Sequence, residues 1–288
     1  MSNQQSHIQC SPKNIPEYFL LPGDPARATK IAKEYLVKSK LISEYREFRA
    51  YSGFYQSVFV GVCSTGIGSP STAIAVEELI NLGAKVLIRV GTCGGALKKE
   101  ISPGSIMIPV AAIREEGTTK EYLPPEFPAV ADRFVVRALE ESARKLNFRY
   151  FVGMNRTHDA FYGQARNLKR WGAIYLDPRL KTWSYPLISS EMECAPLFLI
   201  SFLRGVKAGA VLAVNSYPED LKDIVLNKQK FSTPNAKIST EEAKKSIERA
   251  IQTALNATEL LKVGDGYAGK NNEFADKRKI CRLLRRKE

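Results

Sequence analysis

The sequence predicts an α/β fold, and three observations lead to this prediction. Short apolar, β-branched runs alternate along the chain with segments of helical periodicity. Glycine-containing loops follow several of these runs, as expected where buried strands turn into helices. The 288 residues are 44% hydrophobic and 25% charged, which suits a globular protein with a sizeable core. This length allows one large domain or two small ones, and no linker in the sequence separates two domains.

The first half of the chain contains two predicted helices, at residues 28–35 and 71–82. Gly23 permits a tight turn before the first helix, and Pro25 suits its first position. The second helix has an apolar face and stops at Gly83. Strands are expected at residues 18–21, 51–55, 57–62, 85–90 and 105–110.

The second half continues the same alternation. Asp132 has the character of an N-cap for a helix at residues 134–146, and a helix at 193–203 ends at Gly205. Strands are expected at residues 149–153 and 209–214. Residues 157–166 are predicted to form a polar and aromatic loop, and residues 175–185 an irregular insertion. A capping box at residues 239–242 begins a final helix that reaches about Leu261.

The chain carries a formal net charge of +13, and much of the excess lies in residues 277–287. A charge of this size permits nucleic-acid binding, but such a run is more typical of a solvated tail or a short amphipathic helix. We therefore expect a main domain at residues 1–262, a basic C-terminal tail at 263–288, and no specific nucleic-acid partner.

The cysteines and the hydropathy indicate the compartment. The five cysteines are scattered and form no CxxC pair, so neither a zinc site nor a secreted disulfide framework is predicted. No apolar run is long enough to cross a bilayer, and no signal-peptide pattern is present. A cytoplasmic protein with no membrane partner is expected.

The stretch at residues 85–95 contains the most informative residue. Arg89 lies within an apolar strand, where an arginine is costly unless it meets an anion or a carboxylate. The glycines after it leave backbone N–H groups free to bind an oxyanion. A buried Arg–Glu pair beside an ordinary loop is the alternative, and this stretch alone does not decide between the two. Its glycine spacing fits neither a Walker A loop nor a dinucleotide fingerprint.

Four motifs in a fixed order resemble the nucleoside phosphorylase-I family, and within it the branch that cleaves uridine. The resemblance extends from His7 to about Leu261, and each motif alone is weak. The motifs are Pro22-Gly23-Asp24-Pro25-Ala26-Arg27, Ser64-Thr65-Gly66-Ile67-Gly68, Ile88-Arg89-Val90-Gly91-Thr92 and Glu191-Met192-Glu193.

The resemblance implies a single α/β domain with a central mixed β-sheet flanked by helices. It also implies a homo-oligomer in which dimers build a hexamer. The implied reaction is phosphorolysis of uridine to uracil and ribose 1-phosphate, with inorganic phosphate as co-substrate and no metal or organic cofactor. Catalysis would then consist of positioning and electrostatics around an oxocarbenium-like sugar.

The resemblance also assigns residues to the two substrates. The phosphate is assigned to Gly23, Arg27, Arg89 and Thr92, with Arg46 contributed by the neighbouring subunit. The ribose is assigned to Met192 and Glu193, with His7 reaching the 5′-hydroxyl across the dimer. The base is assigned to Phe161, Gln164 and Arg166. The catalytic residues expected from these assignments are Arg89, Arg166 and Glu193. Glu191 should point to a different face from Glu193 and support the site only indirectly.

Two departures from the family pattern bear on the base. The loop at residues 161–166 is one residue shorter than the common bacterial uridine form. Purine-cleaving relatives usually carry an aspartate where this chain has Ser216. The alternatives are a purine or 5′-methylthioadenosine phosphorylase, a nucleosidase that uses water, and a nucleic-acid-binding protein.

Overall fold

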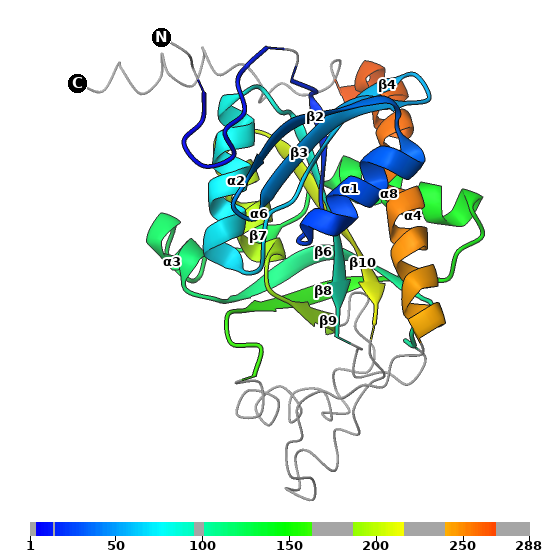
Figure 1. The fold of residues 1–288 in the computed structure, drawn as a ribbon. Coiled ribbons are helices and arrows are strands. Elements are labelled where there is room, and N and C mark those ends of the chain that lie inside the picture. The colour runs from blue at the N-terminus through cyan, green and yellow to red at the C-terminus, as the bar shows by residue number, and fades with distance from the viewer. Residues whose placement is uncertain (1–3, 14, 95–100, 163–186, 216–239, 269–288) are drawn as a thin grey trace, which may run out of the picture.

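The computed structural model of this protein describes residues 4–13, 15–94, 101–162, 187–215 and 240–268. These residues form a ten-stranded mixed sheet with helices on both faces (Figure 1). The strand order is β2-β3-β4-β1-β5-β10-β6-β8-β9, with the short strand β7 paired to β6. The predicted single α/β domain with a central mixed sheet flanked by helices is confirmed. None of the described helices is long and apolar enough to span a membrane.

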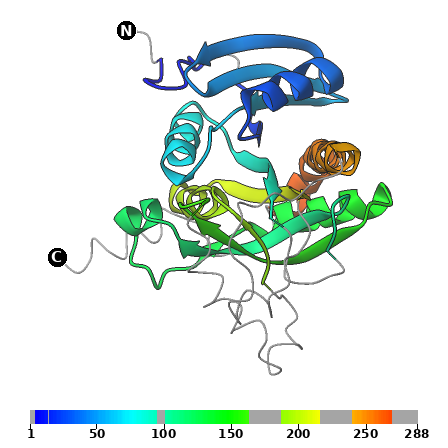
Figure 2. The same cartoon turned by 60° about the horizontal axis from the view of Figure 1, so that its bottom comes forward.

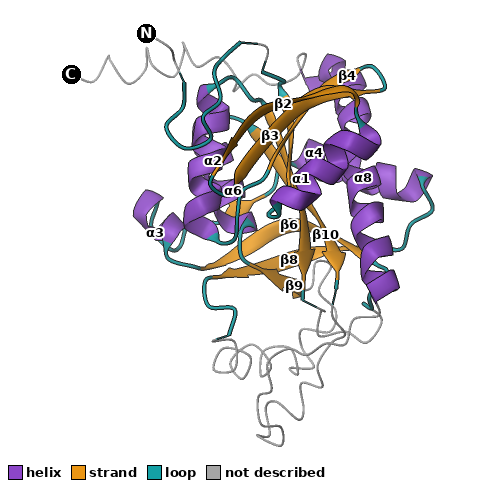
Figure 3. Ribbon diagram, in the orientation of Figure 1, coloured by secondary structure: helices purple, strands orange, loops and turns teal. Residues whose placement is uncertain are grey.

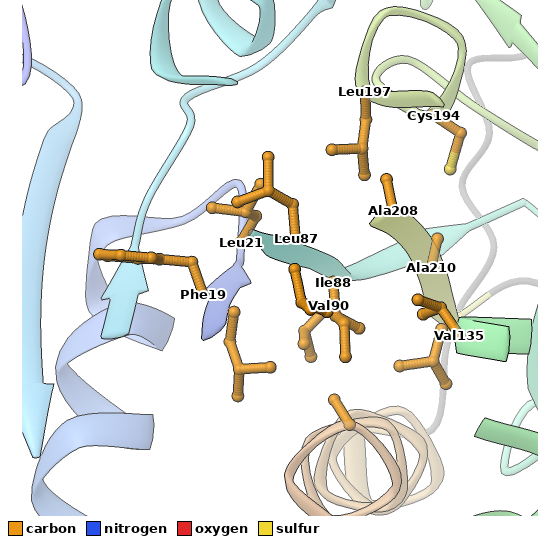
Figure 4. Close-up of a cluster of buried hydrophobic side chains, with 14 of the residues drawn as sticks. Phe19, Leu21, Leu87, Ile88, Val90, Val135, Cys194, Leu197, Ala208 and Ala210 are labelled. Carbon is orange, nitrogen blue, oxygen red and sulfur yellow. The ribbon is translucent and has the colours of Figure 1, made fainter. Parts of the chain in front are cut away.

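Three parallel strands form the centre of the sheet: β1 (Tyr18–Leu21), β5 (Val86–Cys93) and β10 (Lys207–Val214). They are buried almost throughout, which explains their nearly continuous apolar sequences. Figure 4 shows side chains from these strands packed together, among them Phe19, Leu87 and Ala210. Arg89 therefore lies on a rigid element surrounded by the core.

One edge of the sheet consists of the antiparallel strands β2 (Val37–Tyr45), β3 (Phe48–Tyr55) and β4 (Val58–Cys63). In Figure 2 this edge lies at the top of the molecule. β3 and β4 confirm the predicted strand pair. β2 was not predicted, because it is an edge strand with no buried position and so lacks the alternation that marks a half-buried strand.

The other edge consists of β6 (Ile106–Glu115), β8 (Tyr150–His158), β9 (Leu187–Glu191) and β7 (Ala129–Val130). β6 runs antiparallel to β10, while β8 and β9 continue parallel to β6. This edge returns to the centre of the sheet, where the N–H of Gly94 donates to the carbonyl of Ser190 at 3.0 Å. This contact brings the end of β9 back to the end of β5.

The helices pack on both faces of the sheet (Figure 3). α2 and α6 pack together with α3, whereas α4 packs against α8, and α1 covers β3 and β4. The helices are α1 (Pro25–Tyr35), α2 (Ser69–Asn81), α3 (Thr118–Tyr122), α4 (Arg133–Lys145), α6 (Cys194–Arg204) and α8 (Thr240–Ala268). The predicted N-cap at Asp132 is confirmed, since its carboxylate accepts from the N–H groups of Phe134 and Val135 at 2.9 and 3.1 Å.

Several predicted boundaries differ from the structure. β5 does not stop at Val90 but continues to Cys93, because residues 90–93 pair with β10. Thr157 and His158, predicted as loop, belong to β8. The final helix extends to Ala268 rather than Leu261, past the predicted domain boundary at residue 262. The predicted insertion at 175–185 lies outside the described residues, and β9 follows it.

Candidate active site

Arg89 meets two carboxylates in the interior of the protein. Its Nε lies 3.0 Å from Oε2 of Glu191, and its Nη2 pairs with Oε2 of Glu193. The side chain of Arg89 is 6% exposed, so this cluster is almost fully withdrawn from water. The Nη1 atom is also buried and has no hydrogen-bond partner within the described part of the chain. The guanidinium therefore retains N–H groups that an anionic ligand can accept.

The two carboxylates keep Arg89 charged. Burial alone would lower the pKa of Arg89, but the attraction of Glu193 and Glu191 outweighs it and raises the pKa above its ordinary value. The sequence left undecided whether Arg89 binds an oxyanion or forms a buried pair with a glutamate. The structure contains the buried pair. This pair does not exclude an oxyanion site, because Nη1 has no hydrogen-bond partner among the residues that the structure describes.

Glu191 is the most extensively hydrogen-bonded member of the cluster. Its Oε1 accepts from Asn155 Nδ2 and Thr157 Oγ1 at 2.6 and 2.7 Å. Its Oε2 accepts from the backbone N–H groups of Glu193 and Cys194 at 2.7 and 2.9 Å. A carboxylate with four such donors has one orientation, so it fixes the position of the Arg89 Nε beside it.

The prediction that Glu191 and Glu193 point to different faces is wrong, whereas the contact of Glu191 with Arg89 agrees with an indirect role for Glu191. Both carboxylates reach Arg89. Glu191 ends β9, but Glu193 lies in the turn before α6, with φ −137° and ψ −15°. Residues two apart share a face within a strand, so strand geometry gives no reason for these two side chains to diverge. Across the turn before α6, both carboxylates reach the same guanidinium.

Glu193 is held by the glycine loop that precedes α2. Its Oε1 accepts from the N–H of Gly68 at 2.6 Å, and Ser69 Oγ donates to the carbonyl of Met192 at 3.0 Å. Gly68 has φ +94°, a conformation that a residue with a side chain rarely adopts. The loop after β4 and the turn before α6 thus form one hydrogen-bonded unit around the carboxylate.

The electrostatic environment of Glu193 is mixed. Burial raises the pKa of Glu193 above its ordinary value, and the nearby Glu191 carboxylate acts in the same direction. Arg89 and the N–H groups of Gly68 and Met192 oppose this shift. When ionised, the Glu193 carboxylate is a strong hydrogen-bond acceptor for hydroxyl groups, because it is shielded from water.

A second arginine lies beside the first. Arg27, in the first turn of α1, donates from Nη1 to the carbonyl of Val90 at 3.2 Å. Burial lowers the pKa of Arg27, and repulsion from Arg89 lowers it further, while Asp24 and Glu193 oppose the shift. Two mutually repelling guanidinium groups near a helix N-terminus favour a negatively charged ligand.

The backbone packs closely around these cations. A Cβ at Gly91 would lie 2.7 Å from Arg89 Cζ, so only glycine leaves room for the guanidinium there. A Cβ at Gly23 would lie 3.1 Å from the carbonyl of Gly66. The N–H of Thr65 donates to the carbonyl of Pro22 at 2.9 Å, which joins the loops after β1 and β4. Thr92 lies on β5 opposite Ala213 and is half-buried.

Among the described residues, three other predicted site residues, His7, Arg46 and Phe161, take no part in the ion pairs of this cluster. His7 contacts Glu78 on α2, and Arg46 is exposed in the turn between β2 and β3. Their predicted roles across a subunit boundary stay predictions. Phe161 is exposed and packs edge-on against Tyr162. Gln164 and Arg166 lie outside the described residues.

The sequence did not single out Asn155 and Thr157, which orient Glu191. Both are fully buried polar residues on β8. Their spacing of two residues places them on one face of a strand, and this polar alternation was the available signal. The predicted strand at residues 149–153 ends before both residues, whereas β8 continues to His158.

Two buried cysteines lie near the cluster. Burial raises the pKa of Cys93 and of Cys194, which disfavours the thiolate form that a nucleophile needs. Within the described residues, no group of three or more His, Cys, Asp or Glu side chains is arranged to hold a metal ion.

Comparisons with known proteins show the family to which the chain belongs. The chain is 44% identical over 209 residues to a uridine phosphorylase from Treponema pallidum, covering 72% of this chain and 80% of that protein. It is 33% identical to a guanosine phosphorylase from Halorubrum lacusprofundi, covering 90% and 99%. The crystal structure of a uridine phosphorylase from Vibrio fischeri matches with a TM-score of 0.74 at 28% identity, covering 89% and 97%. Residues 17–257 match the profile of the phosphorylase superfamily, and the chain belongs to this family.

Proposed function

We propose that this protein is a uridine phosphorylase, a pentosyltransferase that moves the ribosyl group of uridine to inorganic phosphate. The bond between C1′ and N1 of uracil breaks, and a phosphate oxygen forms the new bond to C1′. The electron pair of the broken bond leaves with uracil, which then takes up a proton. The observation that carries this proposal is the buried Arg89, which is fixed by two carboxylates and lies beside Arg27. Its Nη1 has no hydrogen-bond partner in the described ranges of the chain.

The phosphate is held by Arg89 and Arg27, together with Thr92 and the backbone at Gly23. A phosphate group carries about −1.5 to −2 charges at neutral pH, which two arginines and a helix N-terminus can balance. Arg46 of a neighbouring subunit completes the set. Arg89 has the additional role of holding the phosphate against C1′. The negative charge of the phosphate stabilises the positively charged, oxocarbenium-like sugar.

The ribose lies against Met192, and the carboxylate of Glu193 accepts hydrogen bonds from the 2′- and 3′-hydroxyls. Support for this assignment comes from the ion pair between Glu193 Oε2 and the guanidinium of Arg89, because the reaction requires the ribose and phosphate sites to be adjacent. His7 of a neighbouring subunit binds the 5′-hydroxyl. The oligomer we propose is a hexamer built from dimers, in the cytoplasm.

The base stacks on Phe161 and is recognised by Gln164 and Arg166. An amide pairs with both a carbonyl and an N–H of uracil, while a guanidinium stabilises the negative charge that develops on the leaving ring. No metal or organic cofactor takes part in this proposal, since the developing charges are met by side chains. This assignment predicts that uridine is cleaved much faster than adenosine or 5′-methylthioadenosine.

One observation favours a second substrate class. The relative from Halorubrum lacusprofundi, which matches most of this chain, is named a guanosine phosphorylase. Inosine and guanosine present a 6-oxo acceptor that Arg166 could bind, whereas adenosine presents a donor. A purine nucleoside phosphorylase that prefers 6-oxopurines is therefore the alternative function.

The deciding experiment incubates the protein with uridine, inosine, guanosine or adenosine, each with and without phosphate. Uracil and ribose 1-phosphate should appear from uridine only when phosphate is present. Release of uracil without phosphate would indicate a nucleosidase. Faster cleavage of inosine or guanosine than of uridine would establish the alternative.

A further inference from the structure

The N-terminal segment is fastened to α2 by a single carboxylate. Glu78 accepts from the backbone N–H of His7 at 3.1 Å and from the N–H of Ile8 at 2.8 Å. The ring nitrogen Nδ1 of His7 lies 2.6 Å from Oε1 of the same carboxylate. Ile8 is fully buried, which anchors the segment at this point. Glu78 thus holds both the backbone and the ring of His7.

The contact determines which nitrogen of His7 is available. A carboxylate can only accept, so Nδ1 must carry the hydrogen between the two groups. In the neutral ring the other nitrogen, Nε2, is then the acceptor. Nε2 has no hydrogen-bond partner among the residues that the structure describes. The His7 side chain is 45% exposed while that of Glu78 is 10% exposed, so the ring is held from its buried side.

We propose that Glu78 is a positioning residue for substrate binding, which fixes the orientation and tautomer of His7 so that Nε2 accepts the ribose 5′-hydroxyl. This inference rests on the proposed function, in which His7 acts on the ribose in the neighbouring subunit. A free histidine side chain would lose rotamer freedom on binding the ribose. One already held by Glu78 has lost it during folding, and this preorganisation favours binding.

A purely structural role predicts a different outcome from a positioning role. If Glu78 only stabilised the fold and did not hold His7 in place, its removal would affect every substrate equally. If it orients His7 toward one hydroxyl, its removal affects only substrates that carry that hydroxyl. The comparison of uridine with 5′-deoxyuridine separates these two roles, because the substrates differ only at the 5′-position.

The experiment measures kcat and KM of the full-length protein for both substrates at saturating phosphate. Glu78→Gln should lower kcat/KM for uridine by roughly 10-fold, mainly through KM, and change that for 5′-deoxyuridine by less than about 2-fold. The matched control is Glu77→Gln, the preceding residue on α2, whose carboxylate instead pairs with Arg204. This control should leave kcat/KM for both substrates unchanged. The double variant His7→Ala/Glu78→Gln should lose no more on uridine than His7→Ala alone.

Several results would overturn the inference. These are equal losses on the two substrates, no loss on uridine, or a His7→Ala variant that does not distinguish the substrates. In each case phosphate-dependent cleavage of uridine by the unmodified protein leaves the proposed function intact, whereas its absence refutes that function. If Glu78→Gln does not fold, ¹⁵N NMR of the unmodified protein decides: the neutral His7 ring should be protonated at Nδ1, and protonation at Nε2 alone contradicts the proposal.

Discussion

Replacing Glu191 with glutamine tests whether this carboxylate positions Arg89. The substitution keeps the shape of the side chain and removes its charge. One of its two oxygens becomes an NH₂ group. Because both oxygens accept two hydrogen bonds each, the new donor must face other donors in either orientation of the amide. The ion pair with Arg89 is lost as well.

The structure gives the size of the effect. Removing one partner of a buried ion pair lowers the free energy of unfolding by about 3–5 kcal/mol. The loss here should be near the lower end of this range, because Arg89 keeps its ion pair with Glu193. A loss of about 3 kcal/mol corresponds to a decrease in Tm of roughly 6–12 °C for a chain of this size. Without its anchor Arg89 can shift, and a misplacement of about 1 Å can reduce the rate on the order of 100-fold.

The assay combines thermal unfolding with kinetics of uridine cleavage at varied phosphate concentration. The matched control is Glu116→Gln. Glu116 is also buried and accepts from Thr119, but it has no ion-pair partner within the described residues. The control should lower stability by about 1–3 kcal/mol and leave the kinetics unchanged. Normal phosphate kinetics in a destabilised Glu191→Gln protein would refute the positioning role of this carboxylate.

Three further predictions follow from the same site. Gly91→Ala should reduce kcat/KM for phosphate by about 10- to 100-fold, because the new Cβ displaces the Arg89 guanidinium. Gly117→Ala is the control, because a Cβ at that position makes only an ordinary van der Waals contact. The same kcat/KM for phosphate in the two variants would contradict this reasoning. Mixing Arg46→Ala with Arg89→Ala protein should restore activity when subunits exchange, and proven exchange without activity would exclude a shared site. Burial, with a contribution from Arg156, lowers the pKa of His158, against the opposing effects of Glu191, Glu115 and Asp159. The unfolded chain therefore takes up this proton first as pH falls below about 6.5, and the unfolding free energy decreases. Denaturant titrations at pH 7 and pH 5 should show a smaller decrease for His158→Gln, and an unchanged decrease would disprove the assignment.

Local sequence patterns were sufficient for the centre of the fold. The buried strands β1, β5 and β10 are apolar runs, and the helices after β1 and β4 begin at glycine- and proline-containing turns. The Asp132 cap depends on groups at most three residues apart. Arg89 was identifiable because a charge inside an apolar strand requires a partner, whatever the rest of the chain does.

The identity of that partner was decided only by the tertiary structure. Arg89 is more than 100 residues from Glu191 and Glu193, and they meet because the sheet curls until Gly94 bonds to Ser190. The continuation of β5 through Gly91 depends on pairing with β10, which is also more than 100 residues away in sequence. The edge strand β2 exists through its pairing with β3, since its own side chains are not buried. Local propensity sets which segments can be strands and helices, but long-range pairing determines which charges are brought together and therefore where the site forms.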